Sequence, residues 1–150
     1  MNTLLTTIVL WLSANFNLPA TYEHPRIEFV PSAKIVELRY QELGGAPVQL
    51  GAELNPQKVS GVVSVYDNAT NTIYLPQDWR GNTPAELSIL VHEMVHHLQN
   101  AGRLKFECPQ EREQLAYRAQ EQWLRLFGRD LLQDFELDPF TLLVRTRCGY

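Results

Sequence analysis

The sequence predicts a single α+β domain in which helices predominate. Its 150 residues suit one domain with one hydrophobic core. Several long segments carry apolar residues at helical spacing, three short runs are rich in β-formers, and prolines and glycines mark the boundaries between them. Hydrophobic residues make up 45% of the chain and charged residues 20%, which excludes a disordered or fibrous protein.

Charge and hydropathy exclude two classes of partner. Proteins that bind nucleic acid or anionic membranes gain affinity from clustered Lys and Arg, whereas this chain has a net charge of −4 and no basic block. The longest apolar stretch, residues 4–12, is much shorter than the roughly 20 residues that cross a bilayer. We therefore expect no nucleic-acid partner and no membrane span, and instead a peptide or a small molecule as partner.

The N-terminal part of the chain predicts a helix, a strand and a second helix. Apolar residues over 4–16 repeat at the helical period. A secretory signal would carry Lys or Arg ahead of its apolar run, but the first basic residue is Arg26, so a helix of the folded domain is favoured over a signal. Residues 26–30 alternate like a strand, and a helix over 31–43 follows, ended by Gly44-Gly45.

The middle of the chain predicts a β-hairpin. Residues 47–56 have no periodicity and predict irregular structure. Two β-rich runs, 59–66 and 72–75, flank residues 67–71, whose Asp, Asn and Thr are typical of a turn. We therefore expect a small antiparallel hairpin or sheet.

The clearest helix start in the chain is at Pro84. Thr83 supplies an N-cap hydroxyl, Pro84 occupies the first helical position, and Glu86 follows three residues after the cap, as in a capping box. The helix is expected to end near Gly102. Its residues are apolar nearly all round, which predicts a buried central helix.

The C-terminal third predicts two further helices. Prolines and glycines delimit a helix over 109–127 and a shorter one over 130–136. The Asp138-Pro139 pair interrupts the pattern after them. Residues 140–150 are expected to be extended.

The motif that carries chemistry is His92-Glu93-Met94-Val95-His96 in the buried helix. The spacing of four residues places both imidazoles on one face, at about the separation that two ligands of one zinc ion need. Glu93 is about 100° further round, where it can reach a water molecule beside the metal rather than the metal itself. Two solvated histidines are the plainer interpretation, but polar groups in so apolar a helix need a partner, and a metal supplies one.

A third ligand is expected from the helix over 109–127, which offers Glu111 and Glu113. Glu111 is nearer the start of the helix, where a carboxylate also suits the helix dipole. Glu113 is favoured because its face includes Ala116, which is small enough to let two helix backbones approach closely. The residues that share this face with Glu113 are Ala116, Tyr117, Gln120 and Leu124.

The two motifs together resemble the gluzincin group of zincin metallopeptidases, in which two His on one helix and a Glu on a following helix hold zinc. The Glu113-to-Ala116 spacing is similar to that of the membrane-anchored gluzincins related to the heat-shock peptidase family, where an Asp follows the Ala. Here that position is Tyr117, which becomes a candidate for orienting a ligand or stabilising the transition state. The resemblance implies one zinc ion per chain, held by His92, His96 and Glu113.

Residues 60–125 also resemble a family of small bacterial proteins that are predicted to be minimal zincins. This resemblance implies a zincin-like domain over residues 1–150, with the hairpin packed beside the zinc helix. Zincins commonly place a strand ahead of that helix along the cleft, where it pairs with the extended substrate. The residues expected in this role are Thr72, Ile73, Tyr74 and Leu75.

The expected activity is hydrolysis of peptide bonds, so the expected partner is a peptide or protein substrate. Three protein ligands leave a fourth zinc position for water, and the ion lowers the pKa of that water toward neutrality. Glu93 is expected to act as general base and to pass the proton to the leaving amine. His97 is expected to face away from the ligands, and a polar contact is its favoured role. The candidate donors to the transition-state oxyanion are Tyr117, Tyr150, Arg145 and His97.

The alternative to an enzyme is a zinc-stabilised binding or regulatory module without catalysis. Glu93 favours the enzyme, because a structural zinc site needs ligands but no base. The small size of the chain favours the module, since much of the cleft in larger zincins comes from a second subdomain. A structural site that includes Cys108 is disfavoured, because it would need a further ligand to complete it.

The chain has two cysteines, Cys108 and Cys148, which can form one intramolecular disulfide or remain two buried thiols. A disulfide between them would stabilise the fold by about 4 kcal/mol in the chain-entropy model. The sequence leaves both possibilities open. An extracytoplasmic location is slightly favoured over a cytoplasmic one.

Overall fold

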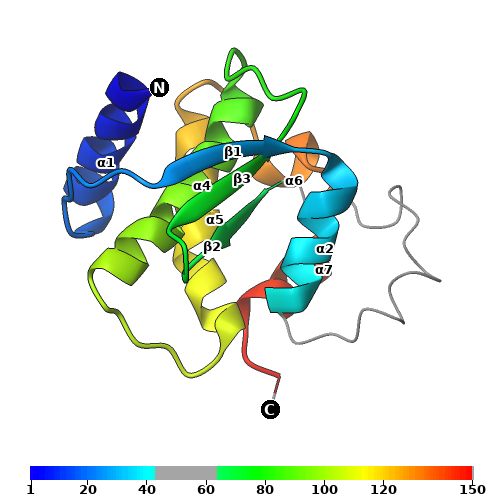
Figure 1. Ribbon diagram of the computed structural model, residues 1–150. Helices are drawn as coiled ribbons and strands as arrows, with labels where there is room; N and C mark the ends of the chain where they lie inside the picture. The colour runs from blue at the N-terminus through cyan, green and yellow to red at the C-terminus, as the bar shows by residue number, and fades with distance from the viewer. Residues whose placement is uncertain (43–63, 150) are drawn as a thin grey trace.

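The predicted helix-rich α+β class is confirmed. The computed structural model describes residues 1–42 and 64–149, and over these ranges the chain forms six helices and three strands (Figure 1). The predicted irregular segment 47–56 and positions 59–63 of the predicted strand lie outside the described residues. In chain order the elements are α1 (Asn2–Phe16), β1 (Arg26–Val30), α2 (Ser32–Glu42), β2 (Val65–Asp67), β3 (Thr72–Pro76), α4 (Pro84–Ala101), α5 (Pro109–Arg125), α6 (Leu131–Asp134) and α7 (Pro139–Thr146).

The three strands form one mixed sheet in the order β1, β3, β2. β2 and β3 are the predicted antiparallel hairpin, with Tyr66 opposite Ile73. β1 pairs with the other side of β3 in parallel, with Ile27 opposite Ile73. The sheet is therefore mixed rather than purely antiparallel, because the alternation within each run does not encode which distant strand it will join.

The central position of β3 corrects the expectation that this strand is open to a substrate. β1 pairs along Thr72–Pro76, and β2 pairs with residues 72–74 from the opposite side. A strand that is paired on both sides has no row of free N–H and C=O groups to offer to a peptide. Among the described strands, the edges of the sheet are β1 and β2. The correction applies to Thr72, Ile73 and Tyr74, whereas Leu75 pairs with β1 alone among the described strands.

α4 lies against the sheet and forms the centre of the hydrophobic core (Figure 1). Every residue from Ser88 to Gln99 is buried, which confirms the predicted buried helix. The hydroxyl of Thr83 accepts a hydrogen bond from the Glu86 backbone N–H at 3.1 Å, and Pro84 is the first helical residue, as predicted. The cap fixes where α4 begins and so fixes which of its faces meets α5.

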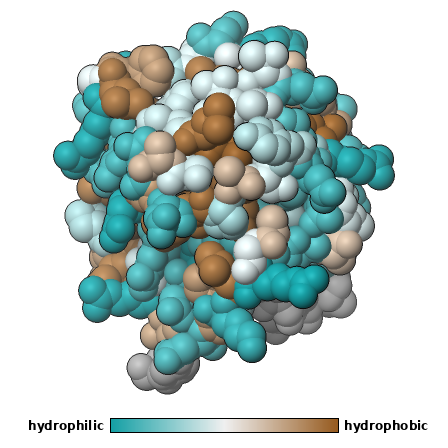
Figure 2. Space-filling model, turned by 90° about the vertical axis from the view of Figure 1, so that its left-hand side faces the viewer, coloured by the Kyte–Doolittle hydropathy of each residue, from teal (hydrophilic) through white to brown (hydrophobic). Residues whose placement is uncertain are grey.

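α1 forms as predicted and belongs to the core. Trp11 meets Trp123 of α5 edge to face, with ring centroids 5.3 Å apart. On the side of the molecule that carries α1, apolar groups lie among hydrophilic ones (Figure 2). The buried residues of α1 are Leu5, Ile8, Val9 and Leu12.

Within the described ranges, no helix has both the length and the apolar composition needed to cross a membrane.

The C-terminal tail is helical, which corrects the prediction of an extended segment over 140–150. α7 occupies Pro139–Thr146, and the Asp138 carboxylate accepts the backbone N–H of Thr141 at 2.8 Å. An aspartate N-cap followed by proline at the first helical position is a strong start signal. The Asp138-Pro139 pair, which interrupts the preceding helix pattern, therefore also begins a new helix.

Cys108 and Cys148 form a disulfide, so the structure selects the bridge from the two possibilities that the sequence leaves open. Their Cα atoms are 5.8 Å apart. The bridge joins the N-cap residue of α5 to the segment that follows α7. It therefore tethers the C-terminal helix beside the first turn of the helix that carries Glu113.

Candidate metal centre

His92, His96 and Glu113 meet between α4 and α5, as the sequence predicts. His92 Nε2 lies 2.8 Å from Glu113 Oε2, and His96 Nε2 lies 3.2 Å from Glu113 Oε1. One candidate ligand atom from each residue can be chosen so that all three lie within 4.8 Å of one another. All three side chains are buried or nearly so. The cluster has the compactness that a single ion requires.

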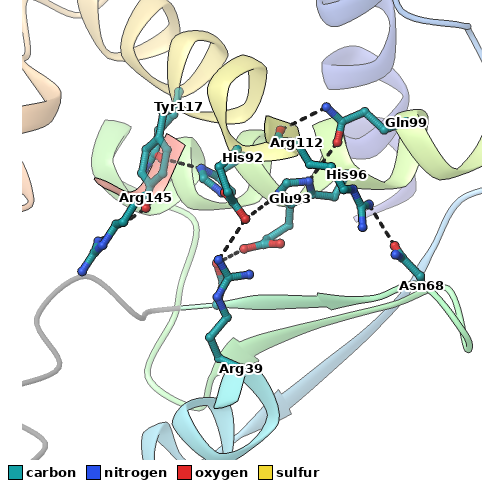
Figure 3. Close-up of polar contacts among 12 residues, drawn as sticks. Arg39, Asn68, His92, Glu93, His96, Gln99, Arg112, Tyr117 and Arg145 are labelled. Carbon is teal, nitrogen blue, oxygen red and sulfur yellow. Dashed lines mark hydrogen bonds and ion pairs between the residues drawn. The ribbon is translucent and has the colours of Figure 1, made fainter. Parts of the chain in front are cut away.

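Local sequence explains why these groups meet. The four-residue spacing places both histidines on the face of α4 that meets α5 (Figure 3). On α5, Glu113 and Ala116 share a face, and Ala116 is fully buried. A small residue at that point lets the two helix backbones come close enough for a glutamate side chain to span the gap.

Glu111 lies outside the cluster, as expected from its place on the helix. Its carboxylate accepts a hydrogen bond from the backbone N–H of Glu107 at 2.6 Å. This bond satisfies a donor just ahead of α5 and places the negative charge in the first turn, where the helix dipole favours it. The preference for Glu113 over Glu111 therefore agrees with the geometry.

A hydrogen-bond chain fixes the orientation of the His96 ring. The Gln99 side chain donates through Nε2 to the backbone carbonyl of Arg112 at 3.1 Å, so its oxygen is the atom that faces His96 Nδ1, at 3.0 Å. Because an amide oxygen only accepts, Nδ1 of His96 carries a proton. In the neutral ring, Nε2 is therefore the nitrogen with the lone pair, and it points at the cluster.

A second chain does the same for His92. The Ser88 hydroxyl donates to the Ala85 carbonyl at 2.7 Å and accepts from Gln120 Nε2 at 3.3 Å. The oxygen of Gln120 then lies 2.9 Å from His92 Nδ1, which must be the donor. Both histidines thus have Nδ1–H tied to a glutamine oxygen and Nε2 directed at Glu113. Partners of this kind on the far nitrogen are what metal-ligating histidines have.

These residues fit a metal ion. His96 Nε2 is buried and makes no hydrogen bond, although it lies next to a carboxylate. In the neutral ring, its lone pair faces the negative Glu113 oxygens, an arrangement that a cation between them would turn from repulsive to attractive. Two imidazole nitrogens and one carboxylate form a donor set typical of catalytic zinc, which keeps a fourth position open.

The electrostatics of the cluster keep Glu113 ionised. Burial by itself would raise the pKa of Glu113, but the charges of His96 and His92 and their contacts with its carboxylate lower the pKa well below its usual value. Burial likewise lowers the pKa of His96, while the Glu113 carboxylate raises it, and the net effect is a raised pKa. Attraction between His96 and the Glu113 carboxylate thus helps to hold the cluster together.

Glu93 lies beside the cluster but contributes no atom to the ligand group (Figure 3). Its carboxylate is buried and accepts a hydrogen bond from the Ser64 hydroxyl at 2.7 Å. Ser64 immediately precedes β2, so the hairpin orients the predicted base. Sequence reasoning missed Ser64, because no local signal ties it to a helix that begins 20 residues later in the chain.

Arg39 of α2 is a further residue that the sequence analysis missed. Its Nη2 lies 2.9 Å from Glu113 Oε1, across 74 positions of sequence. The side chain rises from α2 toward the cluster on α4 (Figure 3). No periodicity or motif links the two positions, so only the packing of α2 reveals the contact.

Tyr117 lies beside the cluster, as predicted. Its ring meets the His92 ring edge to face, with centroids 4.7 Å apart, and its hydroxyl accepts a hydrogen bond from Arg145 Nη1 at 3.4 Å. Burial, and then the charge of Glu113, raise the pKa of Tyr117, so the phenol keeps its proton. Tyr117 and Arg145 are thus the two oxyanion candidates that the structure brings to the site.

Of the other two candidates, His97 is not at the site. His97 faces away from the ligands, as predicted: its Nε2 donates to the Glu23 carbonyl at 2.8 Å and its Nδ1 lies 3.1 Å from the Tyr66 hydroxyl. It ties α4 to the loop ahead of β1 and to the hairpin. Tyr150 lies outside the described residues.

Comparison with curated proteins and with solved structures finds no match. The family model of a domain of unknown function, DUF6647, matches residues 1–149. That match extends over nearly the whole chain and includes every residue of the candidate metal centre. The protein therefore belongs to the DUF6647 family.

Proposed function

We propose that this protein is a zinc-dependent peptidase in which His92, His96 and Glu113 hold one zinc ion and Glu93 is the general base. One observation carries the proposal. The Nε2 atoms of both histidines converge on the Glu113 carboxylate, while their Nδ1 atoms are tied to glutamine oxygens. This is the arrangement expected of a His, His, Glu zinc site with its outer partners already in place.

When bound, zinc supplies Lewis acidity and lowers the pKa of a coordinated water. The protein's own residues position the groups and transfer the proton. The Glu93 carboxylate takes the proton of the attacking water and delivers it to the leaving amine. The bond from Ser64 to Oε1 orients the Glu93 carboxylate, and Oε2 is the oxygen that we propose handles the proton.

Tyr117 is the proposed donor to the negative charge that develops on the substrate carbonyl oxygen. Its phenol remains protonated because burial raises its pKa. Arg145 donates to the phenol oxygen, so the phenol proton is directed elsewhere and can be donated in turn. Contact with the His92 ring holds the phenol close to the ligands.

The position of Glu93 supports an enzyme over a zinc-stabilised binding module. A structural zinc site gains nothing from a carboxylate that is buried, oriented by a hydroxyl and kept out of the ligand set. Burying such a group costs free energy that only a function at that place would justify. We therefore propose catalysis rather than a vestigial or structural site.

The disulfide supports a proposed extracytoplasmic location. Disulfides persist in oxidising compartments and are rare in the cytosol, where thiols are kept reduced. Cys108 and Cys148 form the bridge in this structure. A periplasmic or secreted protein would retain it.

The experiment that tests the proposed activity is digestion of a broad peptide library by the zinc-loaded protein and by Glu93→Gln. The variant keeps the size and polarity of the side chain but cannot take up the proton, so hydrolysis should fall by at least about 100-fold with zinc content and thermal unfolding unchanged. Glu111→Gln is the matched control and should cut like wild type. If wild type cuts nothing and Glu93→Gln binds peptides identically, the binding module replaces the peptidase.

A further inference from the structure

A cavity of about 170 Å³ opens beside the metal centre. His96 and Glu113 form part of its wall, so whatever enters it lies next to the proposed zinc. Pockets for drug-sized ligands have volumes of roughly 300–1,000 Å³. The cavity is smaller than these and suits one amino-acid residue of a longer substrate.

The wall of this cavity is unusually basic for an acidic protein. Arg39 of α2, Arg112 of α5 and Arg145 of α7 all line it, while Glu113, a proposed zinc ligand, is the one carboxylate among the described lining residues. The whole chain carries a net charge of −4, so the positive side chains of this cavity have the opposite sign to the net charge of the molecule. A wall with this charge attracts an anion.

Two of the three guanidinium groups are placed to act at the metal centre. Arg39 Nη2 contacts Glu113 at 2.9 Å, and Arg145 Nη1 contacts the Tyr117 hydroxyl at 3.4 Å. Arg39 reaches the cluster from α2, and Arg145 of α7 lies beside Tyr117 (Figure 3). Arg112 is directed elsewhere, because its Nη2 donates to Asn68 Oδ1 in the turn between β2 and β3.

The chemistry of guanidinium groups indicates which anion fits. Each is planar, stays charged and presents five N–H donors, so it can serve more than one acceptor at a time. Its geometry matches a carboxylate. The Arg39 side chain is only 27% exposed, so its charge is partly shielded from water, and interactions with an incoming anion are strengthened accordingly.

We propose that this cavity binds a carboxylate of the substrate between Arg39 and Arg145, and that the enzyme cleaves peptides next to a residue that bears one. The inference rests on the proposed peptidase function and adds its substrate class. The carboxylate has two sources in a peptide, the C-terminal α-carboxylate and the side chain of Asp or Glu. Both place the same anion within one residue of the scissile bond, which matches the size of the cavity.

The test measures binding without hydrolysis, by titration calorimetry on zinc-loaded Glu93→Gln. The probes are four N-acetylated alanine tetrapeptides: one with a free C-terminus, one amidated, one amidated with Glu at the third position, and one amidated with Gln there. The proposal predicts at least about 10-fold tighter binding of a carboxylate probe than of its amide partner. Tighter binding of the free C-terminus would identify the α-carboxylate as the group bound in the cavity. Tighter binding of the Glu peptide than of the Gln peptide would identify the acidic side chain.

Substitutions of Arg145, added to Glu93→Gln, test whether the preference for a carboxylate arises in this cavity. Arg145→Gln should abolish the preference, and Arg145→Lys should restore part of it by returning the positive charge. Arg147→Gln is the matched control, because it removes the same charge from an exposed position two residues along the chain and should leave the preference intact. A preference that survives in Arg145→Gln would show that Arg145 does not bind the carboxylate and would overturn the proposal, as would equal binding of all four probes.

The outcome also separates this proposal from the peptidase proposal. Hydrolysis by wild type that ignores the carboxylate would leave the peptidase standing and overturn the cavity's role. A binding preference that depends on Arg145, without hydrolysis by wild type, would support the carboxylate site and overturn the peptidase. Thermal unfolding of each variant verifies that the comparison is between folded proteins.

Discussion

Gln99 Oε1 lies 3.0 Å from His96 Nδ1, while the amide nitrogen of the same side chain donates to the Arg112 carbonyl on the neighbouring helix. Gln99 therefore links the zinc-ligand face of α4 to α5 and fixes which nitrogen of His96 is free for a metal. Gln120 does the same for His92 from the opposite helix. Each proposed histidine ligand is thus oriented by an amide that is itself held in place.

Gln99→Ala should lower zinc affinity by about 10- to 100-fold, the usual effect of removing a partner that orients a metal ligand. Competition with a chelator of known zinc affinity measures the change. Gln122→Ala, an exposed substitution on α5, should bind zinc like wild type. Equal zinc affinity in both variants would show that the Gln99 contact plays no part in metal binding.

Glu113→Ala should lose most of the bound zinc, whereas Glu111→Ala should retain about one zinc per chain. The first substitution removes the only carboxylate of the described ligand cluster, and the second removes a group that caps the segment ahead of α5. Elemental analysis of the two purified variants distinguishes them. Equal retention of zinc would remove Glu113 from the site.

The cluster predicts a bell-shaped pH dependence of stability for the metal-free protein. The lowered pKa of Glu113 gives stability that is present above its unfolded value of 4.5 and is lost as pH falls through the folded pKa. The raised pKa of His96 gives stability that is present below 6.5 and is lost as pH rises through the folded pKa. The pair therefore contributes most between those two values.

Denaturant unfolding in the presence of a chelator measures this contribution as the difference between wild type and Glu113→Gln. The subtraction matters because burial lowers the pKa of His97, which makes stability rise with pH in the same range for both proteins. With zinc bound, the optimum should move to higher pH, since protons compete with the metal for histidine. A difference that stays constant from acid to neutral pH would contradict charge compensation in the cluster.

Reduction of the disulfide should destabilise the protein by about 4 kcal/mol, because the bridge spans 40 positions of sequence and restricts the unfolded chain. Thiol titration of denatured, unreduced protein should find no free thiol. Reductant should have no effect on the unfolding of a Cys108→Ser, Cys148→Ser double variant. Two free thiols in the unreduced protein would exclude both the bridge and the argument for an oxidising compartment.

Local signals in the sequence account for the parts of the structure that were predicted well. The cap at Thr83 and the apolar periodicity of α4 define a buried helix, and the spacing of His92 and His96 needs only that helix to become a ligand pair. The place of Glu113 in the site could also be predicted locally, because Ala116 on the same helix face marks the surface of α5 that meets α4.

Contacts between distant segments account for what was missed. Arg39 and Ser64 reach the centre from α2 and from the start of β2, and nothing near them in sequence indicates it. The central place of β3 likewise depends on parallel pairing with β1, which the alternation within each run does not encode. The prediction for the tail was wrong for a different reason, because the Asp138-Pro139 pair both interrupts one helix pattern and caps the next helix.

The most direct test of the account is anomalous diffraction at the zinc absorption edge from crystals equilibrated with zinc. We predict one strong peak per chain, within about 2.0–2.2 Å of Nε2 of His92, Nε2 of His96 and a carboxylate oxygen of Glu113. Glu93 should lie next to that peak without ligating it. A fully formed cluster without a peak, in which Glu113 still contacts both histidines directly, would contradict the metal centre and with it the proposed peptidase.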